Sequence, residues 1–190
     1  MRVTKEAVIQ TASDIADKDG LNNISLKVVA EKLNIRTPSL YNHIASLDDL
    51  LREVAHKGMR TMNDQMTQTA IGTFGDAAIK SVCAVYFKFM IAHPGVYEII
   101  QWATWHGNDE TGKIFGEYKT LLTTLVLSCG LETQYTDEIL SLLTGVLHGY
   151  TTLQLGFALS NPDQAQIGLC NAIDTVLLGI HQKYHNNQNF

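Results

Sequence analysis

The sequence is poor in the residues that interrupt helices and in those that cross-link chains or bind metals. Of its 190 residues, only three are proline and three are cysteine. Because proline breaks helices and strand-like alternation is scarce, we expect an all-α fold. Cys83, Cys129 and Cys170 are odd in number and widely spaced, which fits neither a disulfide framework nor a metal site. We expect them to be reduced thiols in the core.

The sequence also lacks a long apolar stretch and an N-terminal signal pattern. No uninterrupted apolar run reaches the roughly 20 residues that cross a bilayer, and no basic start leads into an apolar segment. We therefore expect a soluble, cytoplasmic protein that does not use a membrane as a partner. Because 45% of its residues are hydrophobic, the chain can still bury a substantial core.

Catalytic and cofactor motifs are missing as well. No Gly-rich phosphate loop, nucleophile elbow or paired-carboxylate site is present. Among the seven histidines, His181 and His185 stand four residues apart, but they lie beside two asparagines and lack supporting carboxylates. We expect no enzymatic activity, no cofactor and no metal site.

Charge is unevenly distributed along the chain. The net charge of −5 argues against a general nucleic-acid binder. Residues 1–60 hold nine Lys and Arg against eight Asp and Glu, whereas residues 61–190 hold five against eleven. This distribution suits an acidic protein whose affinity for DNA comes from a small contact patch near its N-terminus.

Two short helical patterns joined by a tight turn lie within residues 25–51. Ser25 is a candidate N-cap, and apolar residues follow it at helical spacing. Asn34 tolerates the left-handed backbone of a sharp turn. Thr37 and Pro38 then restart a helix, with Thr37 as the cap and Pro38 at the first helical position. The pattern predicts a helix-turn-helix.

The second of these helices has two different faces. Leu40 and Ile44, one turn apart, are expected to face inward. The opposite side carries short hydrogen-bonding groups, with an aromatic and an arginine beside them, and such groups contact base edges and phosphates. Ser46 and Asp49 form a candidate capping box for the next helix. The alternative interpretation is three packed helices with a polar face of no function.

The stretch from Leu33 to Ile44, with Pro-Ser-Leu-Tyr-x-His at 38–43 and Ser-x-Asp-Asp-Leu-Leu at 46–51, resembles the tetracycline-repressor (TetR) family of transcriptional regulators. The resemblance implies a three-helix DNA-binding domain over residues 1–46, a connecting helix over 47–67 and a ligand-binding and dimerisation domain over 74–190, with about nine helices. It also implies that the recognition helix contacts the major groove or its phosphates through Arg36, Thr37, Ser39, Tyr41, Asn42 and His43.

Three positions near this motif need separate comment. Lys27 lies in the first turn of its helix, where a cation and free N–H groups favour a phosphate, although a solvated lysine is an equal alternative. Leu47 stands where many members of the family have a phosphate-binding lysine. Asn42 replaces a common bulky aromatic. The operator sequence and its affinity therefore stay open.

The rest of the chain predicts further helices. A first helix is capped by Thr4 and runs to Asp19, and Gly72 and Gly75 mark a hinge loop within residues 68–75. The segments expected to be helical after that loop are 74–92 or 76–92, 96–105, 111–129, 135–159 or 136–159, and 162–185.

The last two predicted helices, about 136–159 and 162–185, are too apolar for one neighbour to cover. Small residues such as Gly145 and Gly149 would permit close helix approach, so we expect a four-helix homodimer interface. Two interior helices of a monomer are the alternative. The motifs His93-Pro-Gly-Val-Tyr97, 147–155 and 173–180 resemble the WHG-type C-terminal domain of the same family.

Aromatic, apolar and histidine side chains in the C-terminal domain offer apolar walls with a few polar groups, as small-molecule sites require. Most of them can equally be core residues. The residues expected to bind a ligand are Tyr86, Phe89, Met90, Tyr97, Ile100, Trp102, Trp105, His106, Phe115, Tyr118, Leu122 and His148.

The sequence therefore predicts a homodimeric regulator, most simply a repressor, that binds a palindromic operator in double-stranded DNA and is released by a hydrophobic or amphipathic effector. Two alternatives stay open. One is a regulator whose C-terminal domain serves only for dimerisation. The other is a helical ligand-binding protein that does not bind an operator. Leu47, in place of a phosphate-binding lysine, and the net negative charge are consistent with this alternative. Effector identity, target genes and the direction of regulation are left undetermined.

Overall fold

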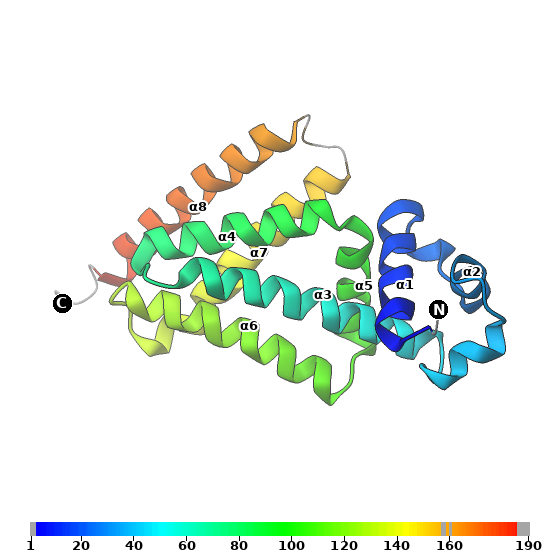
Figure 1. The fold of residues 1–190 in the computed structure, drawn as a ribbon. Helices are drawn as coiled ribbons and strands as arrows, with labels where there is room; N and C mark the ends of the chain where they lie inside the picture. Colours follow the sequence, from blue (N-terminus) through cyan, green and yellow to red (C-terminus); the bar gives the residue numbers. More distant parts are fainter. Residues whose placement is uncertain (1–2, 157–158, 160, 186–190) are drawn as a thin grey trace. The chain divides into compact units, whose positions relative to one another are not determined.

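The computed structural model describes residues 3–156, 159 and 161–185, and the described part of the chain is helical without strands (Figure 1). These described residues form eight α-helices and three 3-10 segments, of which η2 lies where the recognition helix was predicted. The all-α prediction is confirmed. The elements are α1 Lys5–Asp19, η1 Leu21–Asn23, α2 Leu26–Lys32, η2 Thr37–Asn42, α3 Leu47–Ala70, α4 Gly75–Ala92, α5 Pro94–His106, α6 Asp109–Ser128, η3 Thr133–Tyr135, α7 Thr136–Leu155 and α8 Pro162–His185.

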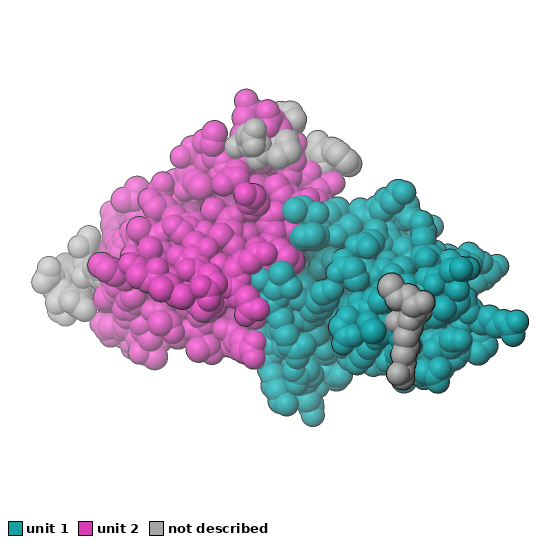
Figure 2. Space-filling model, in the orientation of Figure 1, with its two compact units in different colours: residues 1–61, 92–115 teal, residues 62–91, 116–190 magenta. Residues whose placement is uncertain are grey.

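The chain divides into two compact units (Figure 2). Unit 1 comprises residues 1–61 and 92–115, and unit 2 comprises residues 62–91 and 116–190. Helices α3 and α6 each contribute residues to both units. The functional division into residues 1–46, 47–67 and 74–190 stays a prediction.

Local capping interactions set the helix starts in unit 1. The hydroxyl of Thr4 accepts a hydrogen bond from the Ala7 N–H at the start of α1, and Ser25 caps α2 in the same way. Asn34 has a φ of 54° and is the left-handed residue of the turn after α2. These local predictions are confirmed because each depends on residues only a few positions apart.

The third helix begins with the predicted capping box. The Ser46 hydroxyl accepts from the Asp49 N–H at 3.1 Å, and the Asp49 carboxylate accepts from the Ala45 N–H at 2.8 Å. Several helix bounds differ from the prediction, and α5 and α6 each begin two residues early, at Pro94 and Asp109. Helix α3 continues to Ala70, beyond Thr67, and α7 ends at Leu155, before Leu159. Gly156 is the C-cap of α7, and its N–H donates to the Thr152 carbonyl at 2.9 Å. Residues 157 and 158 lie outside the described residues.

Unit 1 is held together by the packing of α5 against α1 (Figure 1). The Asp17 carboxylate accepts hydrogen bonds from the backbone N–H groups of Gly95 and Val96, at 2.9 and 3.0 Å, and pairs with His93 Nδ1 at 2.9 Å. A Cβ at Gly95 would overlap the backbone carbonyl of Ala16. The two helix backbones therefore touch, and only glycine fits at this position.

Unit 2 is built from α4, α7 and α8 with the adjoining parts of α3 and α6. The largest buried side chains of α4 and α7 include Phe87, Met90 and Leu143. Ion pairs join α8 to its neighbours at Lys80–Asp174 (2.8 Å) and Lys183–Glu138 (2.7 Å). Among the described residues, no helix has the length and apolar character needed to cross a membrane.

Candidate functional site

The turn after α2 and the segment η2 hold the predicted recognition residues on a buried apolar base. Leu40 is 0% exposed and Ile44 is 3% exposed, so the predicted inward face is confirmed. The backbone bonds Ser39 N–H to Arg36 O and His43 N–H to Leu40 O are of the i to i+3 type. The predicted second helix is therefore a 3-10 segment, a form that is common in pieces as short as this one.

The predicted capping role of Thr37 is wrong. The N-cap position of η2 is Arg36, which has an extended backbone, and Thr37 is the first residue of the segment. No side chain caps the segment.

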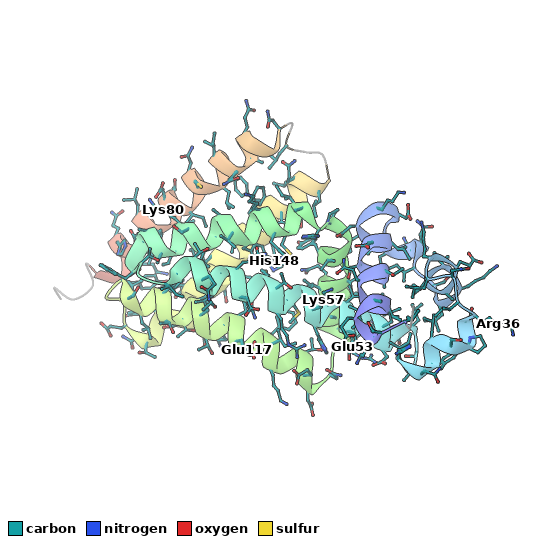
Figure 3. The ribbon with its side chains drawn as sticks, in the orientation of Figure 1. Arg36, Glu53, Lys57, Lys80, Glu117 and His148 are labelled. Carbon is teal, nitrogen blue, oxygen red and sulfur yellow. The ribbon has the colours of Figure 1, made fainter. Side chains whose placement is uncertain are left out.

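All seven residues expected to contact DNA are accessible. Tyr41 is 58% exposed, and Figure 3 shows Arg36 extending away from the rest of unit 1. Lys27 makes a long contact of 3.9 Å with Glu31 on the exposed surface of α2. Among the described residues no ion pair involves Arg36. The exposed members are Lys27, Arg36, Ser39, Tyr41 and Asn42, and the half-buried ones are Thr37 and His43.

An ion pair and a hydrogen bond join α3 to α1 in unit 1. Lys5 pairs with Glu53 at 2.8 Å, and Lys57, which is labelled with Glu53 in Figure 3, donates to Gln10 at 2.5 Å. These two cations are therefore engaged within the protein. Arg36 and Lys27 are exposed near η2 and contribute positive charge to its surroundings.

The residues predicted to bind a ligand divide between the two units. Unit 1 holds Tyr97, Ile100, Trp102, Trp105, His106 and Phe115. Unit 2 holds Tyr86, Phe89, Met90, Tyr118, Leu122 and His148.

The predicted ligand residues of unit 1 have mixed surroundings. Tyr97 and Ile100 are buried, and the Trp102 and His106 rings stack with centroids 4.6 Å apart. Trp105 is 88% exposed and takes no part in the core.

Three of the unit 2 residues form a ring cluster from three helices, which we call the Tyr86–Tyr118–His148 cluster. The Tyr86 ring lies 6.2 Å from the Tyr118 ring and 5.9 Å from the His148 ring, centroid to centroid. The Tyr86 hydroxyl oxygen lies 3.5 Å from each ring nitrogen of His148. Phe89, Met90 and Leu122 are buried in the same unit. Of the twelve residues predicted to bind a ligand, the fold brings these three into contact, and their role in binding stays a prediction.

Burial shifts the pKa of two members of this cluster. It raises the pKa of Tyr118 to about 12, partly opposed by the nearby Thr144 hydroxyl. It also lowers the pKa of His148, which favours the neutral imidazole. Within the described part of the chain, the Tyr118 hydroxyl has no hydrogen-bond partner of normal geometry, although Thr144 lies close. The cluster is therefore polar and uncharged at neutral pH.

Sequence reasoning missed two polar residues that organise unit 1. Asp17 caps α5 from α1, and His56 is buried with its Nε2 2.7 Å from the Thr111 hydroxyl. Only the position of His56 among the apolar residues of α3 signalled its burial. No local sequence signal indicates that Asp17 accepts hydrogen bonds from Gly95 and Val96, which lie 78 and 79 positions further along the chain.

We expect the pH dependence of stability to be smaller in His56→Gln than in the wild type. Burial lowers the pKa of His56 below its ordinary value near 6.5. The unfolded chain therefore binds a proton more readily, and the stability from neutral His56 is lost as pH falls through about 6.5. Chemical denaturation between about pH 7.5 and pH 5 measures the effect. An unchanged slope in His56→Gln would contradict the expectation.

No cluster of histidine, cysteine or acidic side chains suited to a metal ion occurs within the described part of the chain. His181 contacts the Asp76 carboxylate at 2.8 and 3.0 Å, and Cys129 donates to the same carboxylate at 3.5 Å. Burial raises the pKa of Cys129 to about 12, so this thiol stays protonated.

The sequence and fold are similar to those of known regulators. A family model described as "Tetracyclin repressor-like, C-terminal domain" matches residues 79–175. The HTH-type transcriptional regulator YobS of Bacillus subtilis is 32% identical over 183 residues, which cover 94% of this chain and 93% of YobS.

Solved structures agree with this fold. One is a variant TetR from Acinetobacter baumannii in complex with minocycline, with a TM-score of 0.73, 16% identity, and coverage of 96% of this chain and 99% of that one. Another is BioQ with its double-stranded DNA operator, with a TM-score of 0.68, 19% identity, and coverage of 93% and 99%. Since the family model spans half of the chain and YobS matches over nearly its full length, the chain belongs to the tetracycline-repressor (TetR) family of DNA-binding transcriptional regulators.

Proposed function

We propose that the protein is a cytoplasmic, homodimeric repressor that binds a palindromic operator and releases it when a small hydrophobic or amphipathic effector binds. The observation that carries the DNA-binding part is the arrangement of η2. Ser39, Tyr41 and Asn42 are exposed while Leu40 and Ile44 anchor the segment in the core. A surface segment fixed from beneath can present side chains to a groove without losing its own order.

The residues of η2 have different expected roles. Arg36 precedes the segment and can donate two hydrogen bonds to a guanine, while Thr37 is placed to contact a base beside it. The exposed Tyr41 hydroxyl suits a phosphate oxygen. Lys27 suits a second phosphate, and Ser39, Asn42 and His43 supply further polar contacts. In a homodimer, two such segments would enter successive major grooves about one helical turn apart.

Dimerisation is supported by apolar residues that the single chain leaves exposed on α7 and α8. Leu142 and Leu153 of α7 are 46% and 47% exposed, and Ile167 and Leu178 of α8 are 62% and 71% exposed. A Cβ at Gly145 would meet no neighbouring atom, so the surface of α7 between these leucines is open to close approach. Exposed apolar patches of this kind usually mark an interface, here most simply a two-fold one.

The effector would bind the C-terminal domain, where the Tyr86–Tyr118–His148 cluster combines apolar walls with polar groups. The structural neighbour from Acinetobacter baumannii is in complex with minocycline, which supports a ligand role for this fold. To release DNA, the effector must bind the DNA-free conformation more tightly than the DNA-bound one. Helix α3 is continuous from Leu47 to Ala70 and contributes to both units, so we expect it to transmit the change, with the loop at Gly72 and Gly75 as hinge.

We expect Arg36→Ala and Tyr41→Ala each to weaken operator binding about 10- to 100-fold, because a good base or phosphate contact contributes about 1–3 kcal/mol. Arg36→Ala should also reduce discrimination between operator and random DNA. Fluorescence anisotropy of a labelled duplex from upstream of the coding region measures both effects. Lys88→Ala, at an exposed position of α4, is the matched control and should bind normally.

The same assay, repeated at several salt concentrations and with random DNA, tests whether the protein binds an operator at all. Operator binding should weaken as salt rises, since phosphate contacts release counterions. If the wild type binds the duplex no better than random DNA, selection from a random pool provides a second test. If the selection yields no bound sequence, the repressor proposal is contradicted, and a helical ligand-binding protein without operator binding is favoured.

A further inference from the structure

The Tyr86–Tyr118–His148 cluster has an unusual polar member in the interior of unit 2. The three side chains come from α4, α6 and α7. The centroid of the Tyr86 ring lies 6.2 Å from that of Tyr118 and 5.9 Å from that of His148. The oxygen of Tyr118 is buried and, among the described residues, has no hydrogen-bond partner of normal geometry, although the Thr144 hydroxyl lies close enough to influence its pKa. Buried polar groups are nearly always satisfied, so an unsatisfied phenol needs a physical reason.

The hydroxyl of Tyr118 can still donate. Burial raises its pKa to about 12, so the group keeps its proton at neutral pH. A phenol O–H donates to a carbonyl or hydroxyl oxygen, and satisfying a buried donor recovers the cost of removing it from water. An oxygen atom of a bound molecule would therefore supply the interaction that the protein leaves unmade.

The surroundings of the cluster favour an uncharged partner. Burial lowers the pKa of His148 and is the largest cause that raises the pKa of Tyr118, so the cluster lies where desolvation disfavours charge. A carboxylate or an ammonium group bound here would lose its hydration in the same way. Either charge would be strongly disfavoured.

We propose that the effector is an uncharged aromatic molecule whose carbonyl or hydroxyl oxygen accepts a hydrogen bond from Tyr118 and whose ring packs against Tyr86 and His148. The inference rests on the proposed function, because it identifies the chemical class of the effector. Aromatic rings favour tilted and edge-to-face contacts, the geometries already present among the three side chains. Leu122, one turn after Tyr118 on α6, is buried and gives the apolar surface for such a ring.

Matched pairs of probes test the charge requirement. Acetophenone and acetonaphthone are neutral ketones, and benzoate and naphthoate are their anionic counterparts of similar shape. Isothermal titration calorimetry on the full chain at neutral pH should show binding of at least one ketone, at least tenfold tighter than its carboxylate partner. A carboxylate that binds as tightly as its ketone, or the absence of binding by all four probes at millimolar concentration, would overturn the inference.

The variant Tyr118→Phe separates ligand binding from a structural role. It removes only the unsatisfied hydroxyl, so the melting temperature should stay unchanged or rise while the ketone binds at least tenfold more weakly. Tyr135→Phe is the matched control, since its ring packs on Tyr184, outside the cluster, and ketone binding should be unaffected. Ketone affinity unchanged in Tyr118→Phe would overturn the proposal even if the wild type binds ketones.

Operator binding by the ligand-free protein is measured separately. A protein that binds ketones but no DNA would contradict the repressor function and leave the site intact. A protein that binds its operator but none of the four probes would contradict the site and leave DNA binding intact. The two failures are therefore distinguishable.

Discussion

Gly95→Ala should lower the free energy of unfolding by about 3 kcal/mol, because the new methyl group would overlap the Ala16 carbonyl where α1 and α5 touch. The obstructing atoms belong to backbone, so a change of side-chain rotamer cannot relieve the overlap. Separating the helices would also disturb the hydrogen bonds from the Gly95 and Val96 N–H groups to Asp17. For a chain of this size the melting temperature should fall by about 10 °C.

Gly116→Ala is the matched control for this substitution. Gly116 lies within α6, and a Cβ there would meet no neighbouring atom. Alanine should therefore stabilise the helix by about 0.4–1 kcal/mol by restricting the unfolded chain. Thermal and urea denaturation of both variants measures the difference. Equal stability of Gly95→Ala and the wild type would show that α1 and α5 are not in backbone contact in solution.

Leu178→Arg should weaken self-association at least 100-fold if α8 forms the homodimer interface. Leu178 is 71% exposed in the single chain, so an arginine there costs little before association. In a two-fold interface each substitution occurs twice, and burying unpaired charges costs several kcal/mol. A 100-fold change corresponds to about 2.8 kcal/mol. Operator affinity should fall as well, because two linked contacts become one.

Ile71→Arg is the control for a charge placed on an equally exposed apolar position. Ile71 is 67% exposed, but it lies in the loop between α3 and α4 and belongs to neither α7 nor α8. Sedimentation equilibrium should show a dimer for this variant and for the wild type, and a monomer for Leu178→Arg at the same concentration. A dimer that survives in Leu178→Arg would place the interface elsewhere, and a monomeric wild type would contradict the homodimer.

The sequence was most informative where structure depends on neighbouring residues. The N-caps at Thr4 and Ser25 and the left-handed turn at Asn34 could all be predicted, since each involves a segment of four or five residues. Helical periodicity overran the end of α7, which was predicted at Leu159 and lies at Leu155.

The contacts that organise the candidate sites depend on distant parts of the chain. The bond from Gly95 to Asp17 spans 78 positions, and the pair Tyr86–His148 spans 62. Residue types alone suggested twelve ligand-binding candidates, but they did not indicate that Trp105 is 88% exposed or that Tyr118 lacks a hydrogen bond of normal geometry. Such features arise only when helices pack against one another, and the residue pattern of one segment does not reveal which helices it will contact.

The positions of the two tryptophans have a practical consequence for spectroscopy. Both Trp102 and Trp105 belong to unit 1, so intrinsic tryptophan emission reports the folding of that unit. The high exposure of Trp105 shifts its emission to the red even in the native state, and the His106 ring stacked on Trp102 is a candidate quencher. Circular dichroism reports the helices of both units. A chain that unfolds in one step gives coincident curves by the two methods, whereas separate unfolding of the units splits them.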